Sequence, residues 1–251
     1  MEAISKIASA RRCDVDHGNT SLACITVQSK RDRLANSCDI SWRHDSFAAR
    51  QFPTGETLSE ENSVMTDIWI RSASNFFAFL RMDTSAVTSP NGAGSGTVNG
   101  QFYGPGSEPI TATGNDEVFF VPVSDTAFAL RSIVSANAYL RMDGSSVTEF
   151  NVDGSGTVNC QYYPQGAQPQ AVPGNDEVFR FVSIPNSPVV AIRSFNYPNA
   201  YLRMNAARVT SRQGNGSGIV NCQYYAPGSL PQWTPGNLEV FHVSAIPIRT
   251  S

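Results

Sequence analysis

Three copies of one short stretch decide the fold: AFLRMD at 78–83, AYLRMD at 138–143 and AYLRMN at 200–205. Apolar and polar residues alternate within each copy, so that Leu140 and Met142, for example, fall on the same face of an extended chain. A period of two is the pattern of a β-strand with one buried face. The repetition therefore predicts three related strands at equivalent places in a repeated structure.

Three further blocks accompany each copy in the same order. Ile/Leu-Arg-Ser comes before it, Gly-Ser-Gly-x-Val-Asn-x-Gln follows it, and Gly-Asn-x-Glu-Val-Phe closes the unit. The spacing is regular, because Arg71, Arg131 and Arg193 of the first block lie 60 and 62 residues apart, and the asparagines of the third block repeat these intervals. Four blocks in one order, three times over, indicate a triplicated unit.

Each unit is expected to contain four strands separated by Gly- and Pro-rich turns. In the first unit these strands are predicted at 68–72, 77–82, 97–103 and 117–123. Three four-stranded units are too few for a β-propeller, which has at least about four blades. Closure into a barrel around a three-fold axis removes the open strand edges. We therefore predict an all-β protein, a β-trefoil of three four-stranded repeats with pseudo-three-fold symmetry, at about 68–125, 128–187 and 189–247.

The composition excludes several classes of function. Charged residues make up only 16% of the 251 residues, against about 25% in typical globular chains, which excludes a charge-rich disordered protein. A net charge of −3 provides no basic field for nucleic acid or an anionic membrane. No run approaches the roughly 20 apolar residues of a membrane span, and residues 1–25 lack the apolar core of a signal peptide. We expect a cytoplasmic protein, with unconventional secretion left open.

The first 64 residues do not join the repeats. They hold three of the five cysteines, without a Cys-x-x-Cys pair, so we predict no zinc or other metal site. We expect residues 1–64 to be a weakly ordered or unassigned N-terminal extension, with a strand at 24–27 and a short helix at 2–11, and residues 65–251 to form the β-trefoil domain. The other two cysteines, Cys160 and Cys222, occupy equivalent strand positions and are expected to be unreactive core thiols.

No catalytic residues are predicted. His242 is the only histidine in the repeats and no Gly-x-Ser-x-Gly is present, so a Ser-His-Asp triad lacks its base. Adjacent carboxylates occur at Asp116-Glu117 and Asp176-Glu177. If these pairs lie in strands, the two side chains of each point to opposite faces and cannot flank one bond. We therefore expect a protein that is not an enzyme and uses no cofactor.

The repeats do carry groups that suit a sugar ligand, which needs planar hydrogen-bonding groups and an aromatic face. Each unit has an Asp or Asn after the Arg-Met strand, a tyrosine at the end of the third strand, and polar residues in the turn before the last strand. The candidate ligand-binding residues are Asp83, Tyr103, Asn115, Asp116, Asp143, Tyr163, Asn175, Asp176, Asn205, Tyr225 and Asn237. A structural role stays open for all of them, because Asp and Asn close turns and tyrosines pack within strands.

Both sets of repeated arginines are expected to pair with the glutamates of the closing block rather than with a ligand. The members of these sets are Arg71, Arg131 and Arg193, Arg81, Arg141 and Arg203, and Glu117, Glu177 and Glu239.

The Arg-Ser, Tyr-Leu-Arg and Glu-x-Phe blocks resemble those of the fascin-like and AbfB-like (arabinofuranose-binding) branches of the β-trefoil superfamily, over about residues 68–246. The Gln-x-Trp motif of ricin-B-type lectins is missing. The AbfB resemblance implies arabinofuranose contacts from a His directly after Tyr-Leu-Arg and from an Asp three residues before the closing Phe. Methionine replaces that His in all three units, whereas the Asp remains as Asp116 and Asp176 and is Leu238 in the third unit.

These observations favour a non-catalytic, lectin-like carbohydrate-binding protein whose partners are glycans or glycoproteins. Repeated sites on one body raise avidity for clustered glycans, and units one and two should bind better than unit three. The main alternative is a fascin-like module that binds actin or another protein. Actin filaments are acidic, whereas residues 65–251 carry ten arginines and no lysine against twelve acidic residues. A protease-inhibitor trefoil that acts through one loop is a further alternative.

Overall fold

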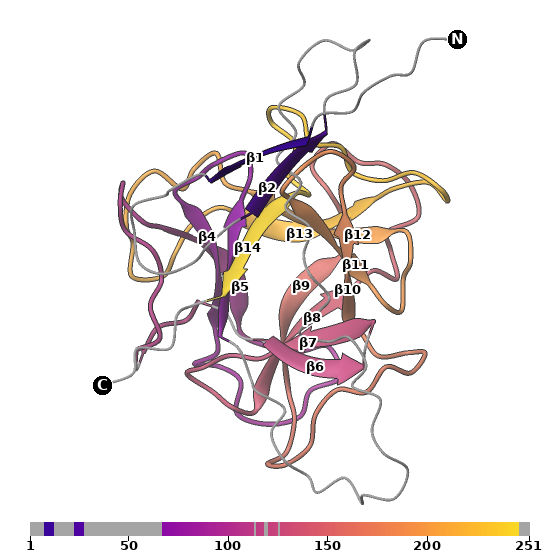
Figure 1. The fold of residues 1–251 in the computed structure, drawn as a ribbon. Coiled ribbons are helices and arrows are strands. Elements are labelled where there is room, and N and C mark those ends of the chain that lie inside the picture. The colour runs from indigo at the N-terminus through magenta and orange to yellow at the C-terminus, as the bar shows by residue number, and fades with distance from the viewer. Residues whose placement is uncertain are drawn as a thin grey trace, which may run out of the picture. The chain divides into compact units, whose positions relative to one another are not determined.

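The computed structural model describes residues 8–12, 23–27, 67–112, 114–117, 120–124 and 126–245. All the regular structure in these ranges is β, in fourteen strands (Figure 1). Within the described ranges no helix is long and apolar enough to cross a bilayer. The chain divides into two units, Met1–Thr57 and Leu58–Ser251, which are described separately below.

The N-terminal unit contains one antiparallel pair of strands, β1 (Ala8–Arg12) and β2 (Ala23–Val27), in which Ala8 lies opposite Val27. The strand expected at 24–27 is confirmed. The helix expected at 2–11 is wrong over residues 8–11, because these residues pair with β2 and cross-strand pairing overrides a weak local helix preference. The remainder of the predicted 1–64 extension lies outside the described residues.

The second unit contains the triplicated sequence, and each repeat contributes four strands. The first repeat forms β3 (Ile68–Ser72), β4 (Ala78–Asp83), β5 (Thr97–Phe102) and β6 (Phe120–Ser124). The second forms β7 (Ala127–Leu130), β8 (Ala138–Asp143), β9 (Thr157–Tyr162) and β10 (Phe179–Ser183). The third forms β11 (Val190–Ser194), β12 (Ala200–Asn205), β13 (Ile219–Tyr224) and β14 (Phe241–Ala245).

The strands are arranged as a β-trefoil. The first and last strands of the three repeats are hydrogen-bonded side by side in the order β3-β14-β11-β10-β7-β6, and the two middle strands of each repeat form the hairpins β4-β5, β8-β9 and β12-β13. The predicted all-β fold with pseudo-three-fold symmetry is confirmed.

The three hairpins interlock in a cycle. Ser95 of the first repeat bridges to Cys160 of the second, Ser155 of the second to Cys222 of the third, and Ser217 of the third back to Gly100 of the first. Each bridge joins the Gly-Ser-Gly loop of one repeat to the third strand of another, so the loops are held between repeats.

Equivalent apolar residues of the three repeats fill the common core. The leucines and methionines of the Tyr/Phe-Leu-Arg-Met strands are all fully buried, as the alternating pattern requires. Cys160 and Cys222 are also fully buried and unpaired. Burial raises the pKa of Cys160 to about 12, and it raises the pKa of Cys222 as well. Both are therefore core thiols that do not ionise near neutral pH.

Candidate functional site

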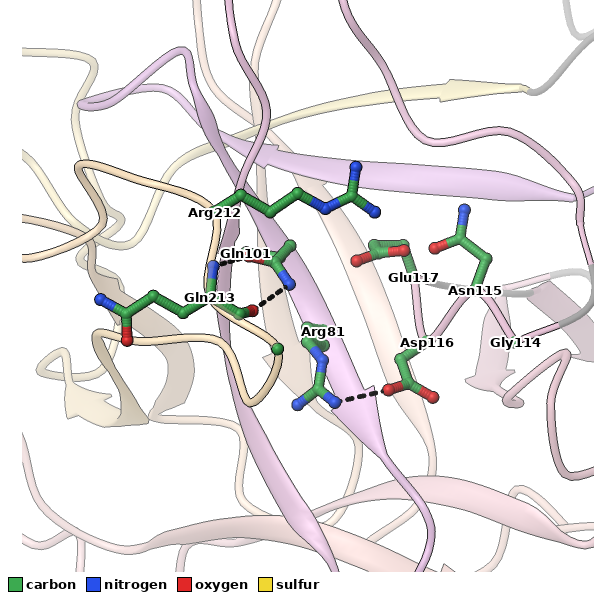
Figure 2. Close-up of a pocket in the computed structure, with 9 residues that line it drawn as sticks. Arg81, Gln101, Gly114, Asn115, Asp116, Glu117, Arg212 and Gln213 are labelled. Carbon is green, nitrogen blue, oxygen red and sulfur yellow. Dashed lines mark hydrogen bonds and ion pairs between the residues drawn. The ribbon is translucent and has the colours of Figure 1, made fainter.

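A cavity of about 140 Å³ lies between the first repeat and a loop of the third (Figure 2). The first repeat supplies one side from strands β4 and β5 and from the turn that precedes β6. The third repeat supplies the other side from the loop before β13. The lining residues are Arg81, Gln101, Gly114, Asn115, Asp116, Glu117, Arg212, Gln213 and Gly214.

Two side-chain amide contacts hold the walls of the cavity together. Gln101 on β5 donates from Nε2 to the carbonyl oxygen of Gln213 at 2.8 Å, and its Oε1 accepts from the Gln213 amide at 3.3 Å (Figure 2). The third repeat uses the same contact against the second, because Gln223 Nε2 donates to the carbonyl of Asn151 at 2.7 Å. The position of the cavity wall is therefore a consequence of the repeat-to-repeat packing.

Arg81 organises the charges at the base of the cavity. Its Nη2 donates to Asp116 Oδ2 at 2.6 Å and to Asp83 Oδ2 at 3.2 Å, and its Nη1 donates to the carbonyl of Asn215 at 3.1 Å. Asp83 also accepts from the hydroxyl and amide of Ser85, and these hydrogen bonds lower the pKa of Asp83. Asp83 thus closes a turn and orients Arg81, while Asp116 lines the cavity.

Glu117 is the most unusual group of the cavity, because it is only 4% exposed and its Oε2 makes no hydrogen bond to the residues that the structure describes. Burial raises the pKa of Glu117, and the nearby Tyr103 hydroxyl opposes this rise, although that hydroxyl donates to Asn115 rather than to Glu117 Oε2. The equivalent glutamates are satisfied: Tyr163 donates its hydroxyl to Glu177 Oε2 at 3.0 Å, and Tyr225 does the same to Glu239 Oε2 at 3.1 Å. A buried carboxylate oxygen without a donor is costly, so Glu117 is the least satisfied of the three equivalent glutamates.

The three candidate tyrosines have their rings packed inside the repeats. Tyr103, Tyr163 and Tyr225 make edge-to-face contacts with the aromatic residue of the neighbouring strand, at ring-centroid distances of 5.1, 5.1 and 5.2 Å. Tyr103 is 8% exposed, and its hydroxyl donates to Asn115 Oδ1 at 3.3 Å. The tyrosines therefore position polar groups of the sites rather than offer a stacking face.

The corresponding place in the second repeat has a similar charge network. Arg141 Nη2 donates to Asp143 Oδ2 at 3.0 Å and to Asp176 Oδ2 at 2.9 Å. Asp176 Oδ1 also accepts from the side chain of Asn196 at 2.9 Å, and Asn175 Nδ2 donates to the Tyr163 hydroxyl at 3.4 Å. The carboxylate of Asp176 therefore accepts hydrogen bonds on both oxygens, whereas that of Asp116 accepts one from the described residues on Oδ2 only.

The third repeat differs most. Leu238 replaces the aspartate, and Arg203 Nη1 and Nη2 donate to the carbonyls of Asp153 and Val152 at 2.8 and 2.9 Å. Asn205 accepts the amide of Ala207, and Asn237 accepts that of Glu239, so both close turns. The candidate residues of this repeat thus have structural roles.

The expected pairing of repeated arginines with the closing glutamates is found in part. Arg141 Nε lies 3.8 Å from Glu177 Oε1, and Arg203 Nε lies 3.5 Å from Glu239 Oε1. In the first repeat the nearest acidic partner of Arg81 is Asp116 instead. Arg71 approaches Glu108 at 3.9 Å.

The turn before β6 changes what the two adjacent carboxylates can do. The last strand of the first repeat begins at Phe120 and not at residue 117, so Asp116 and Glu117 lie in a turn. Both line the same cavity. The expectation that they point to opposite faces of a strand is therefore wrong for this pair.

Sequence reasoning missed Arg212, Gln101 and Gln213. Arg212 is exposed, and its guanidinium carbon lies 5.3 Å from the ring centroid of Tyr103. In Figure 2, Arg212 reaches from its loop toward Asn115 and Glu117. The equivalent positions are Pro90 and Phe150, so only a search for charged departures from the repeat could have found Arg212.

No protein-family model and no curated protein matches the chain. Several solved structures are similar to it. ThreeFoil, a designed three-fold symmetric protein, is 14% identical with a TM-score of 0.45, over 70% of this chain and 96% of that one. The Polyporus squamosus lectin bound to a human-type influenza-binding epitope is 14% identical with a TM-score of 0.41, over 74% of this chain and 50% of that one. The Haemophilus ducreyi cytolethal distending toxin is 12% identical with a TM-score of 0.43, over 81% of this chain and 95% of that one.

Proposed function

We propose that this protein is a non-catalytic carbohydrate-binding β-trefoil that takes one sugar residue in the cavity between its first and third repeats. The observation that carries the proposal is Glu117 Oε2, a buried carboxylate oxygen that lines the cavity and lacks a donor. A sugar hydroxyl is a donor of the right size, and a hydrogen bond to a charged acceptor is among the stronger kinds.

The other lining groups suit the same ligand. Arg81, Arg212 and Asn115 supply donors, while Asp116 and Asn115 supply acceptors. Hydroxyl groups both donate and accept, so a polyhydroxylated ring can use such a mixed set. The volume of about 140 Å³ is below the ~300–1,000 Å³ of sites for drug-sized ligands, which favours a single monosaccharide unit over a long chain.

The carboxylate pair is proposed to bind rather than to catalyse. Asp116 Oδ2 is engaged by Arg81 at 2.6 Å, so this oxygen is not free to attack a substrate, although burial raises the pKa of the carboxyl. Retaining and inverting glycosidases instead place two free carboxylates on either side of the scissile bond. Release of product from any bound oligosaccharide would contradict this part of the proposal.

The test compares matched glutamate variants on a glycan array, followed by titration calorimetry with each sugar that binds. Glu117→Gln should weaken sugar binding by about tenfold or more, because it removes a charged acceptor. Glu239→Gln is the control, since its carboxylate is already bonded to Tyr225, and it should bind as the unmodified protein does. Equal affinity of both variants for the sugar would overturn the proposal. The proposal would also be overturned if no glycan on the array binds and the protein instead co-sediments with F-actin or inhibits a protease.

A further inference from the structure

Two arginines lie directly opposite each other on the outside of the trefoil. In the antiparallel pair β10-β11, Arg180 is the register partner of Arg193. Their chain neighbours Phe179 and Ile192 are fully buried in the core, so the arginine side chains project away from it. Residues paired in this way have Cβ atoms about 5 Å apart, and like charges so placed repel each other.

Neither arginine has an acidic partner among the described residues. The guanidinium carbon of Arg180 lies 4.9 Å from the ring centroid of Phe195. The Nε atoms of Arg180 and Arg193 are buried and make no hydrogen bond to the described residues, and the same holds for Arg71. Arg81, Arg141 and Arg203, by contrast, all contact carboxylates within 4 Å. What distinguishes Arg180 and Arg193 is therefore that two cations lie side by side without a carboxylate partner in the described part of the chain.

The equivalent pair elsewhere in the barrel shows how the chain avoids this repulsion without a ligand. Arg71 on β3 lies opposite His242 on β14. Burial and the Arg71 charge lower the pKa of His242, so this imidazole is neutral at pH 7. Arg71 also has Glu108 at 3.9 Å. At the β10-β11 position the residue equivalent to His242 is Arg180, which is a second permanent cation.

We propose that Arg180 and Arg193 together bind a tetrahedral oxyanion, a sulfate or phosphate group, on the outer face of the β10-β11 pair. Guanidinium groups match the oxygen spacing of such anions and can donate in pairs. A doubly charged anion between the two guanidinium groups would replace repulsion by attraction. The site shares no residue with the cavity of the first repeat, so it is independent of the proposed sugar site.

The test measures the thermal midpoint of unfolding, and the affinity by calorimetry, with inorganic sulfate and phosphate. Arg180→Gln and Arg193→Gln are compared with Arg208→Gln, a control at an exposed position. Sulfate should bind the unmodified protein and the control alike, and about tenfold more weakly to each of the other two variants. Without sulfate, Arg193→Gln should be at least as stable as the unmodified protein, because it removes the repulsion and keeps the contact of Arg180 with Phe195.

Sodium sulfate stabilises most proteins by exclusion from their surface, so sodium chloride at equal ionic strength provides the baseline. An equal rise in midpoint for all four proteins would overturn the proposal, as would a lower midpoint of Arg193→Gln in the sulfate-free buffer. Galactose 6-sulfate distinguishes the source of the anion. Tighter binding than inorganic sulfate, lost in the two arginine variants, would identify a sulfated sugar as the ligand, and equal binding would identify the free ion.

Discussion

The contact between Gly216 and Asn99 joins the two repeats that form the cavity, and Gly216→Ala is predicted to break it. Gly216 has φ of +67°, and a Cβ added to it would overlap Asn99 Oδ1 and lie 2.8 Å from the carbonyl oxygen of Gly100. The left-handed conformation costs alanine roughly 1–2 kcal/mol. Displacing Asn99 would break the 2.6 Å bond from its Nδ2 to the carbonyl of Asn215, which costs about 1–3 kcal/mol when the groups stay buried.

The expected loss for Gly216→Ala is therefore about 2–5 kcal/mol of unfolding free energy, or a fall of roughly 4–20 °C in the thermal midpoint for a domain of this size. Urea titration followed by tryptophan fluorescence measures it. Gly214→Ala in the same loop is the control, because the added methyl group would have no atom within 4 Å, and it should change stability by less than about 0.5 kcal/mol.

A double variant isolates the steric part of this loss. Asn99→Ala removes the side chain that the new methyl group would meet, so Gly216→Ala should cost less in that background than alone, by about 1 kcal/mol or more. If Gly216→Ala matches Gly214→Ala, or if the two changes are additive, the loop is not held in the way we describe.

Three other outcomes follow from the same contacts. Tyr163→Phe should lose about 1–3 kcal/mol in urea unfolding, because Glu177 Oε2 would be left buried without its donor; a loss below about 0.5 kcal/mol would contradict that. The folded-state pKa of Asp83 is lowered, so its stabilising effect is complete above the unfolded value near 3.8 and disappears as the pH falls through the folded value. Asp83→Asn should therefore destabilise the protein at pH 7 but not at pH 2, and a constant difference would refute this. Cys160 and Cys222 should resist alkylation in the native state and react in denaturant, as peptide mass mapping can show, because burial raises the pKa of both thiols.

The fold was predictable because it depends on local patterns that occur three times. Each repeat places Leu and Met two residues apart on a strand, as in Leu80 and Met82, and only a buried strand face accounts for that alternation. The turn glycines marked the strand ends to within a few residues. The start of β6 was placed too early because a glutamate followed by Val-Phe has the alternation typical of a strand, although Glu117 itself lies in the turn.

The site was only partly predictable because it forms between segments far apart in the sequence. Asp116 was identified from its place in a repeated block, but the wall opposite comes from residues 212–214, almost 100 residues later. Nothing local indicates that Gln101 would bond to Gln213 across that separation. The packing role of the tyrosines could not be predicted either, because the sequence around a strand tyrosine does not indicate whether its ring faces solvent or a neighbouring ring.

The three junctions between repeats have the same backbone arrangement but different side chains. This difference in side chains is what makes one of the junctions a candidate site. Arg212 lies over the Tyr103 ring at the junction with the cavity, and the equivalent loop positions at the other two junctions are Pro90 and Phe150. Residues needed for the fold must satisfy all three junctions, so they repeat. A ligand needs only one junction, and the groups that serve it are free to differ. Glu117, whose Oε2 has no donor among the described residues, and Arg212, which has no charged equivalent in the other repeats, line the same cavity. This coincidence is the reason why we propose a binding role for this junction and not for the other two.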